Sequence, residues 1–158
     1  MTRRYAYSLG GSRAVDSAPL SKPKNTTILS SIQLDGTLRY TTFSGGTTVE
    51  RFKRYLETDL LPHLNGNSVL IMDNMKSHHA KAVKNLLDSS EIRYIYLPPY
   101  SPDLNPIEKL WSKVKSFLRK FKARTLDALP NTMQCAFQTV SPSDCSGWFH
   151  SRGYSPYF

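Results

Sequence analysis

Two acidic residues lie where an α/β protein places its ligand-binding groups. Asp73 directly follows the apolar run 69–72, and open α/β sheets bind ligands at the carboxyl ends of their strands. Glu108 lies 35 positions further on, in the first turn of the helix expected after the next strand. A helix and a strand of that combined length return the chain to the same sheet edge. Carboxylates that meet there would bind a hard cation such as Mg²⁺ or Mn²⁺, so the spacing predicts an acidic metal site.

Each of these residues also has a purely structural interpretation. Asn105 stands three residues before Glu108, which is the spacing of a capping box that needs no metal. Asp73 and the asparagine after it are typical turn residues at the end of a strand. The adjacent His78 and His79 are candidate ligands or acid–base groups, yet two histidines at a helix start are also typical of exposed structural positions. Residue spacing alone leaves these alternatives open.

A run of positive charge follows Glu108. Seven of the 20 positions from 105 to 124 are lysine or arginine, and five of them fall within the expected helix: Lys109, Lys113, Lys115, Arg119 and Lys120. A helix with an acid in its first turn and this charge after it can join metal chemistry to phosphate-backbone contacts. The same charges also suit an ordinary solvated helix face opposite the apolar stripe. We expect these five residues to bind nucleic acid, with a solvated face as the alternative.

The composition of the chain agrees with an anionic partner. It has 158 residues, 39% of them hydrophobic, a formal net charge of +9 and a pI near 9.7. That length suits one globular domain with its own core, and the surplus of positive charge attracts phosphate or acidic surfaces. Apolar runs reach only four or five residues, far short of the ~20 that a membrane span needs. We therefore expect a cytoplasmic protein without membrane contact, in which Cys135 and Cys145 are free thiols.

Hydrophobic periodicity predicts the elements that would position the acids. β-Branched and aromatic residues over 26–43 flank Asp35-Gly36, which predicts a β-hairpin with a two-residue turn and positive φ at both turn residues. Apolar residues spaced by three or four predict helices over 48–61, closed by Pro62, over 77–89 and over 106–121. The apolar runs 68–72 and 92–97 predict parallel neighbouring strands, buried on both faces. A short strand is expected at 5–8, and the fold class is α/β.

Two longer segments resemble a known family. Residues 70–78 read Leu-Ile-Met-Asp-Asn-Met-Lys-Ser-His, and residues 97–115 read Leu-Pro-Pro-Tyr-Ser-Pro-Asp-Leu-Asn-Pro-Ile-Glu-Lys-Leu-Trp-Ser-Lys-Val-Lys. Both closely resemble bacterial insertion-sequence transposases related to the mariner elements, whose DDE catalytic domain has a ribonuclease-H-like fold. The 34 residues between Asp73 and Glu108 match the spacing between the second and third acids of that family.

The resemblance implies a definite chemistry. Asp73 would be the second catalytic acid and Glu108 the third, in a triad that binds two divalent ions, Mg²⁺ or Mn²⁺, for strand cleavage and strand transfer in DNA transposition. The implied partners are DNA, as transposon ends and as target, and a second copy of the chain in a homodimer. His78 or His79 falls where the family often has a histidine, and the resemblance assigns it no role.

The sequence also departs from the family pattern. The first acid is expected on the opening strand of the fold, usually as an Asp-Glu pair, shortly before a segment that resembles residues 4–14. This sequence begins just after that point, neither Asp16 nor Asp35 stands in a matching context, and no helix-turn-helix module precedes the domain. We therefore expect an N-terminally truncated ribonuclease-H-like fold, in which the neighbours of the missing strand keep unpaired backbone groups.

These expectations divide the chain and limit its activity. The expected segments are a basic arm over 1–25, a truncated DDE core over 26–125 and a C-terminal segment over 126–158. The expected function is that of a DDE transposase fragment, inactive or nearly so alone because the first catalytic aspartate is missing. One alternative is the second half of a split or frameshifted transposase, active only when joined to its upstream part. Another is a non-catalytic nucleic-acid-binding fragment.

Overall fold

The computed structural model describes residues 8, 10, 12–13, 25–121 and 128–154. The arm expected over 1–25 and the strand expected at 5–8 lie almost wholly outside these residues. In chain order the described elements are β1 (Thr26–Ile32), β2 (Leu38–Ser44), α1 (Val49–Tyr55), the π-helical turn η2 (Leu56–Leu60), the 3₁₀ turn η3 (Leu61–His63), β3 (Val69–Met72), α2 (Lys81–Ser89), β4 (Arg93–Tyr96), the 3₁₀ turn η4 (Pro102–Leu104), α3 (Ile107–Lys120), α4 (Ala128–Gln138) and α5 (Pro142–His150).

β1 and β2 form the predicted antiparallel hairpin and pair along their whole length. The turn between them differs from the prediction. Gly36 has a positive φ of +92°, whereas Asp35 does not. The prediction of a two-residue turn with positive φ at both turn residues is therefore wrong. Instead the amide of Gly36 donates to the carbonyl of Gln33 (3.1 Å), and the Asp35 carboxylate accepts from the amide of Thr37 (2.8 Å). The longer turn satisfies Asp35 locally, as expected of an aspartate in a turn.

The predicted helix over 48–61 begins as expected and ends later. The hydroxyl of Thr48 caps α1 by accepting from the amide of Arg51 (3.3 Å). The chain then stays helical through η2 and η3 as far as His63. Pro62 does not close the helix, because it lies in the first turn of η3, where the missing N–H group costs no hydrogen bond.

β3 and β4 are parallel neighbours, as the sequence predicts, with Met72 opposite Tyr96. The helix expected from residue 77 begins only at Lys81. Residues 75–79 form turns instead, in which the amide of His78 donates to the carbonyl of Met75 (3.0 Å). These turns bring the chain after β3 back toward the end of that strand.

The prediction that these two strands are buried on both faces is wrong. Leu70 and Met72 belong to a core that α1 and α2 complete, whereas Val69 and Ile95 are 41% and 54% exposed. Successive side chains of a strand point to opposite faces. The described elements therefore cover one face of this two-stranded sheet and leave the other partly open.

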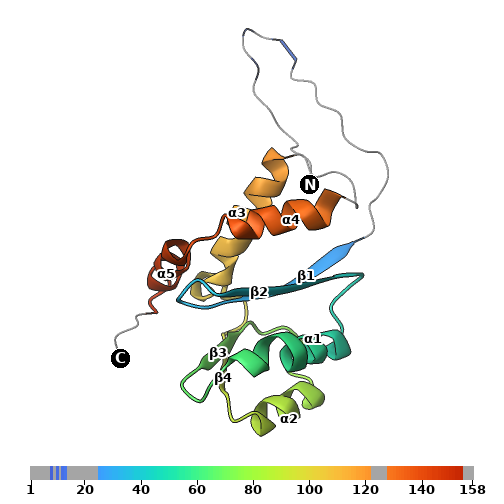
Figure 1. Cartoon of the computed structure of the whole chain (residues 1–158), viewed down its shortest axis with the longest axis vertical. Coiled ribbons are helices and arrows are strands. Elements are labelled where there is room, and N and C mark those ends of the chain that lie inside the picture. Colours follow the sequence, from blue (N-terminus) through green and yellow to red (C-terminus); the bar gives the residue numbers. More distant parts are fainter. Residues whose placement is uncertain (1–7, 9, 11, 14–24, 122–127, 155–158) are drawn as a thin grey trace.

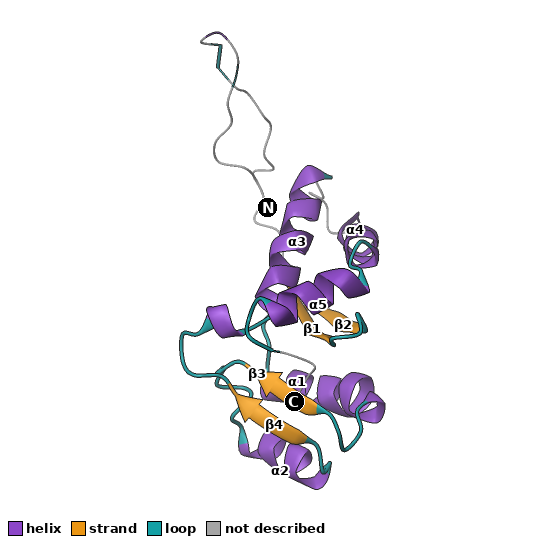
Figure 2. Ribbon diagram, turned by 90° about the vertical axis from the view of Figure 1, so that its left-hand side faces the viewer, coloured by secondary structure: helices purple, strands orange, loops and turns teal. Residues whose placement is uncertain are grey.

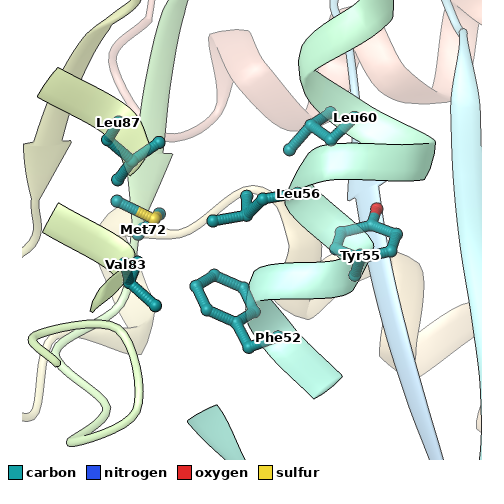
Figure 3. Packing of buried hydrophobic residues seen from close by; sticks show 7 residues of the cluster. All are labelled: Phe52, Tyr55, Leu56, Leu60, Met72, Val83 and Leu87. Carbon is teal, nitrogen blue, oxygen red and sulfur yellow. The ribbon is translucent and has the colours of Figure 1, made fainter. Parts of the chain in front are cut away.

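The hairpin separates two hydrophobic cores. Figure 1 shows α3, α4 and α5 on one side of β1 and β2, and α1, α2, β3 and β4 on the other; the turned view in Figure 2 agrees. One strand serves both sides, because Leu29 packs against the core of α1 and α2, and Ile28 and Ile32 pack against that of α3 and α4. The first core, drawn in Figure 3, consists of Phe52, Tyr55, Leu56, Leu60, Met72, Val83 and Leu87. The second consists of Leu110, Val114, Leu118, Met133, Ala136 and Phe137.

An apolar cleft of about 340 Å³ lies between β1 and β3. Residues 28–33 and 69–73 line it along consecutive positions, together with side chains of α1 and the start of α3. Among the described residues β1 pairs only with β2, and β3 only with β4. Both strands therefore present an edge without a ladder partner to this β1–β3 cleft. Unpaired edges of this kind can accept a further strand.

Candidate metal and DNA site

Asp73 lies at the carboxyl end of β3, where the sequence predicts a ligand-binding residue. Its Oδ1 atom accepts a hydrogen bond from the amide of Met75 (3.2 Å) and lies 2.8 Å from Nδ1 of His78, which also hydrogen-bonds to the Asp73 carbonyl (3.2 Å). The turn interpretation of Asp73 is thus confirmed, but the side chain stays 52% exposed. The hydrogen bond from His78 lowers the pKa of Asp73 below its ordinary value, against the opposing effect of burial. The carboxylate is therefore ionised at neutral pH and still accessible.

Both histidines pack against the turn after β3. His78 is buried, and its ring packs at a tilt against Phe52, with ring centroids 4.1 Å apart. The Nε2 atom of His79 contacts the Oδ1 atom of Asn74, and its ring stacks on Tyr96 at 4.1 Å. The interpretation as exposed residues at a helix start is therefore wrong, because this turn and its aromatic neighbours hold both rings.

Glu108 lies exposed in the first turn of α3, as predicted. The capping-box alternative is wrong. The Asn105 side chain accepts from the amide of Ile107 (3.4 Å), and no side-chain hydrogen bond caps α3. Among the described residues, the Glu108 carboxylate has no hydrogen-bond or ion-pair partner. It is therefore free to bind a cation from solvent.

Asp73 and the residues just before Glu108 reach one cleft from different elements. Asp73 lines the β1–β3 cleft together with Asn105, Pro106 and Ile107, the residues that lead directly into Glu108. Mg²⁺ and Mn²⁺ suit such exposed carboxylates, because they bind through one or two of them and fill the remaining positions with water and phosphate oxygens. Within the described part of the chain, no group of three or more His, Cys, Asp or Glu side chains could hold a metal ion. The donors thus fit a divalent cation, as part of a ligand set.

The basic residues of α3 do not all point the same way. With 3.6 residues per turn, Lys115 and Arg119 lie within about 20° of Glu108 around the helix, roughly 10 and 16 Å along its axis. Lys109 and Lys120 are exposed on a neighbouring face. The acid and two of the five predicted cations therefore form one exposed line on α3, which we call the α3 basic face: Glu108, Lys115 and Arg119.

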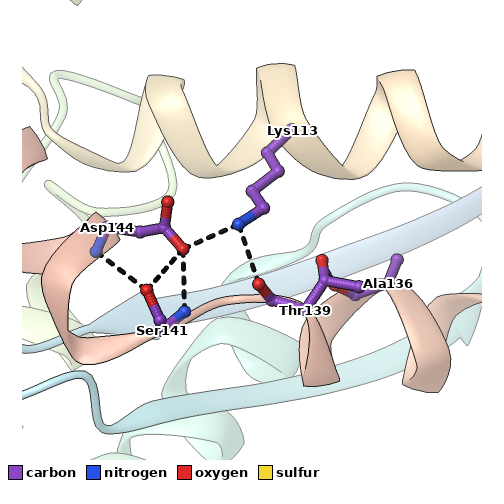
Figure 4. Close-up of polar contacts among 5 residues, drawn as sticks. All are labelled: Lys113, Ala136, Thr139, Ser141 and Asp144. Carbon is purple, nitrogen blue, oxygen red and sulfur yellow. Dashed lines mark hydrogen bonds and ion pairs between the residues drawn. The ribbon is translucent and has the colours of Figure 1, made fainter.

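Lys113 instead joins α3 to the C-terminal segment. Its ammonium group donates to the Asp144 carboxylate (2.6 Å) and to the carbonyl of Thr139 (2.8 Å) (Figure 4). The same carboxylate accepts from the amide and hydroxyl of Ser141, both at 2.8 Å, and closes a capping box at the start of α5. Lys113 lowers the pKa of Asp144 to about 2, and the Ser141 hydrogen bonds add to this effect. The structure thus gives Lys113 an intramolecular partner; its contact with nucleic acid stays a prediction.

Residues after α5 hold the loop that leads into α3. The Tyr154 hydroxyl donates to the carbonyl of Leu104 (2.8 Å), and Arg152 pairs with Asp103 (3.6 Å). Sequence reasoning missed these contacts, because they join positions about 50 residues apart. The only sequence signal was the Ser-x-x-Asp spacing at 141–144, which marks the start of α5.

Comparison with known proteins gives one family match and several relatives. A family model described as DDE superfamily endonuclease matches residues 1–130. The Tc1 transposase of Caenorhabditis elegans is 27% identical over 120 residues, which cover 66% of this chain and 44% of that protein. The Tcb2 transposase of Caenorhabditis briggsae is 31% identical over 75 residues, which cover 48% of this chain and 28% of that protein. The chain thus spans less than half the length of these relatives.

Solved structures share its fold. A pre-cleavage Mos1 transpososome matches with a TM-score of 0.80 at 20% identity, covering 95% of this chain and 48% of that chain. A Mos1 mariner paired-end complex with Mn matches with a TM-score of 0.78 at 20% identity, covering 96% and 48%. The catalytic domain of Mos1 mariner transposase matches with a TM-score of 0.71 at 19% identity, covering 84% and 71%. The predicted ribonuclease-H-like fold class is confirmed. No helix in the described part of the chain is long and apolar enough to cross a membrane.

Proposed function

Because the chain belongs to the DDE superfamily of endonucleases, we propose that it is part of an insertion-sequence transposase that cleaves and rejoins DNA. The observation that carries this proposal is the convergence of Asp73 and the start of α3 on one cleft, in a chain whose relatives are Tc1 and Tcb2 transposases. We also propose that the chain comes from a bacterial insertion sequence, as the two motifs at 70–78 and 97–115 imply.

Asp73 and Glu108 are the proposed metal ligands. The unengaged Oδ2 atom of Asp73 and the exposed carboxylate of Glu108 would hold Mg²⁺ or Mn²⁺. Divalent ions at such a site supply activation of a water or 3′-hydroxyl nucleophile and stabilisation of the leaving oxygen at phosphorus. The role of the protein is to keep the Asp73 carboxylate ionised and to bring it to the same cleft as the start of α3, beside the DNA.

The α3 basic face is the proposed DNA contact. Lys115 and Arg119 lie in line with Glu108 along the helix. A DNA strand with one phosphate at Glu108 would therefore pass both cations. Contacts of this kind bind backbone phosphates without reading bases, and each one steepens the salt dependence of binding. We expect Lys109 and Lys120 to contribute from the neighbouring face and Lys113 to contribute less, because Asp144 occupies its ammonium group.

We further propose that the chain works joined to an upstream part that completes the site. Two acids alone provide too few ligands for a two-metal centre, and the β1–β3 cleft, with its two unpaired strand edges, favours an added strand that brings the third carboxylate beside Asp73. The chain alone would then be inactive or nearly so. This is the split-transposase alternative, and the cleft is the observation in its favour.

The test starts with the DNA upstream of the codon for Met1, translated in three frames and searched for an apolar strand that ends in Asp-Glu. The chain and its joined product are then assayed for Mn²⁺-dependent nicking of supercoiled plasmid. We expect nicking only by the joined product, lost in Asp73→Asn and Glu108→Gln and kept in the matched control Glu57→Gln, an exposed acid on η2. Nicking that survives both site substitutions would contradict the proposed ligands.

The non-catalytic DNA-binding fragment remains the second candidate, and the α3 basic face favours it. A measurement of DNA binding in the absence of metal distinguishes this candidate from the enzyme. Salt-sensitive binding that survives Asp73→Asn and Glu108→Gln, without nicking by any joined product, would support the binder over the enzyme. If Lys115→Met reduces the slope of log binding constant against log salt concentration by about one unit, the phosphate contact lies on α3.

A further inference from the structure

The Asp73 carboxylate is held at one oxygen and open at the other. Oδ1 lies 2.8 Å from Nδ1 of His78 and accepts from the amide of Met75 (3.2 Å). The same Nδ1 atom lies 3.2 Å from the Asp73 carbonyl, so His78 contacts both the side chain and the backbone of Asp73. Oδ2 has no partner in the described part of the chain. These two contacts restrain the carboxylate at one oxygen, and the side chain is still 52% exposed, so the other oxygen is available as an acceptor.

His78 is itself held from three sides. Its ring packs at a tilt against Phe52 of the first core (4.1 Å). Its amide donates to the Met75 carbonyl (3.0 Å), and its carbonyl accepts from the Tyr96 hydroxyl (2.8 Å). The side chain is only 11% exposed. The donor therefore cannot follow the carboxylate if Asp73 turns, so the hydrogen bond restrains Asp73 rather than moving with it.

We propose that His78 is a positioning residue for the metal site: it holds Asp73 with Oδ1 engaged and Oδ2 presented to a divalent cation. The inference rests on the proposed function, in which Asp73 is a metal ligand. Carboxylate ligands are commonly oriented by hydrogen bonds from outside the coordination sphere, and losing such a bond weakens metal binding. The sequence left the role of the two histidines open, and the structure separates them, because His79 contacts Asn74 and not Asp73.

Two substitutions at position 78 separate the hydrogen bond from the packing. His78→Phe keeps an aromatic ring against Phe52 and removes the donor. His78→Asn removes the ring and puts an amide N–H near the position of Nδ1. His79→Phe is the matched control, because it changes the neighbouring ring without touching Asp73.

Metal binding is measured on the full 158-residue chain by Mn²⁺ titration, following the broadening of the Met75 amide signal in NMR spectra, which detects even millimolar affinities. We expect His78→Phe to weaken binding by about tenfold, His78→Asn to recover part of that loss, and His79→Phe to stay within twofold. Thermal unfolding of each variant without metal controls for misfolding. Unchanged Mn²⁺ affinity in a folded His78→Phe variant would overturn the inference.

Asp73→Asn distinguishes failure of the inference from failure of the proposed function. If this substitution removes the broadening and His78→Phe does not weaken it, the metal site stands and only the positioning role is wrong. If Asp73→Asn leaves the broadening unchanged, Asp73 is not a ligand, and the proposed site and the inference both fall.

Discussion

The ion pair between Lys113 and Asp144 predicts a measurable link between the helix that carries Glu108 and the C-terminal segment. The pair is 2.6 Å long, and the side chains are 35% and 29% exposed. Lowering the pKa of Asp144 from 3.8 to about 2 corresponds to at most about 2.5 kcal/mol. Solvent screening and the share of Ser141 in this effect reduce the part that belongs to Lys113 to about 1 kcal/mol.

A double-mutant cycle tests this value. Lys113→Met and Asp144→Asn are made singly and together, and the free energy of unfolding is measured in urea. We expect a coupling of about 1 kcal/mol at pH 7. Lys115→Met is the matched control, because Lys115 is exposed on the same helix, and we expect its effect on stability to stay within about 0.5 kcal/mol. A coupling near zero at pH 7 would refute the reasoning.

The pH dependence of the coupling has a definite sign. The folded state lowers the pKa of Asp144, so the pair adds stability that is fully present above the ordinary value of 3.8 and is lost as the pH falls through about 2. The coupling should therefore be constant from pH 7 to pH 5 and should decline between about pH 4 and pH 2. A coupling that declines between pH 7 and pH 5 would assign the effect to another titrating group.

Two further substitutions and one labelling experiment test the packing of the fold. Leu56→Ala opens a cavity at a fully buried position of the first core and should lower the free energy of unfolding by about 3 kcal/mol in urea; a loss below about 1 kcal/mol would mean that the core is loosely packed. Gly36→Ala should cost about 2 kcal/mol in thermal unfolding, because φ is +92° and an added Cβ would lie 2.8 Å from the Pro142 backbone; an unchanged Tm would contradict the contact between the hairpin turn and α5. Burial raises the pKa of the Cys145 thiol, so mass spectrometry should show iodoacetamide modifying the exposed Cys135 first, and equal rates would exclude this burial.

Local sequence patterns were sufficient for the hairpin, the two parallel strands and the helices between residues 48 and 121, and they placed Asp73 at a strand end and Glu108 in the first turn of a helix. Alternation of β-branched residues predicted the hairpin, and the apolar run before Asp73 predicted a strand that ends there. These inferences succeed because strand, turn and helix-start preferences depend on residues close in sequence. The longer helix beyond Pro62 was missed because a proline in the first turn of a 3₁₀ segment does not end helical structure. The exposure of Ile95 was missed because burial depends on which elements cover the sheet.

The sequence by itself determined the acids, their spacing, the basic helix after them and the family they resemble. Tertiary structure alone decided how these side chains are used. It gave Lys113 a partner on α5 and set His78 rather than His79 against Asp73. Residue type and spacing determine what chemistry a side chain can perform. Which of two adjacent histidines meets a carboxylate depends on how the turn after β3 closes and on the ring of Phe52, more than twenty positions earlier, against which His78 packs.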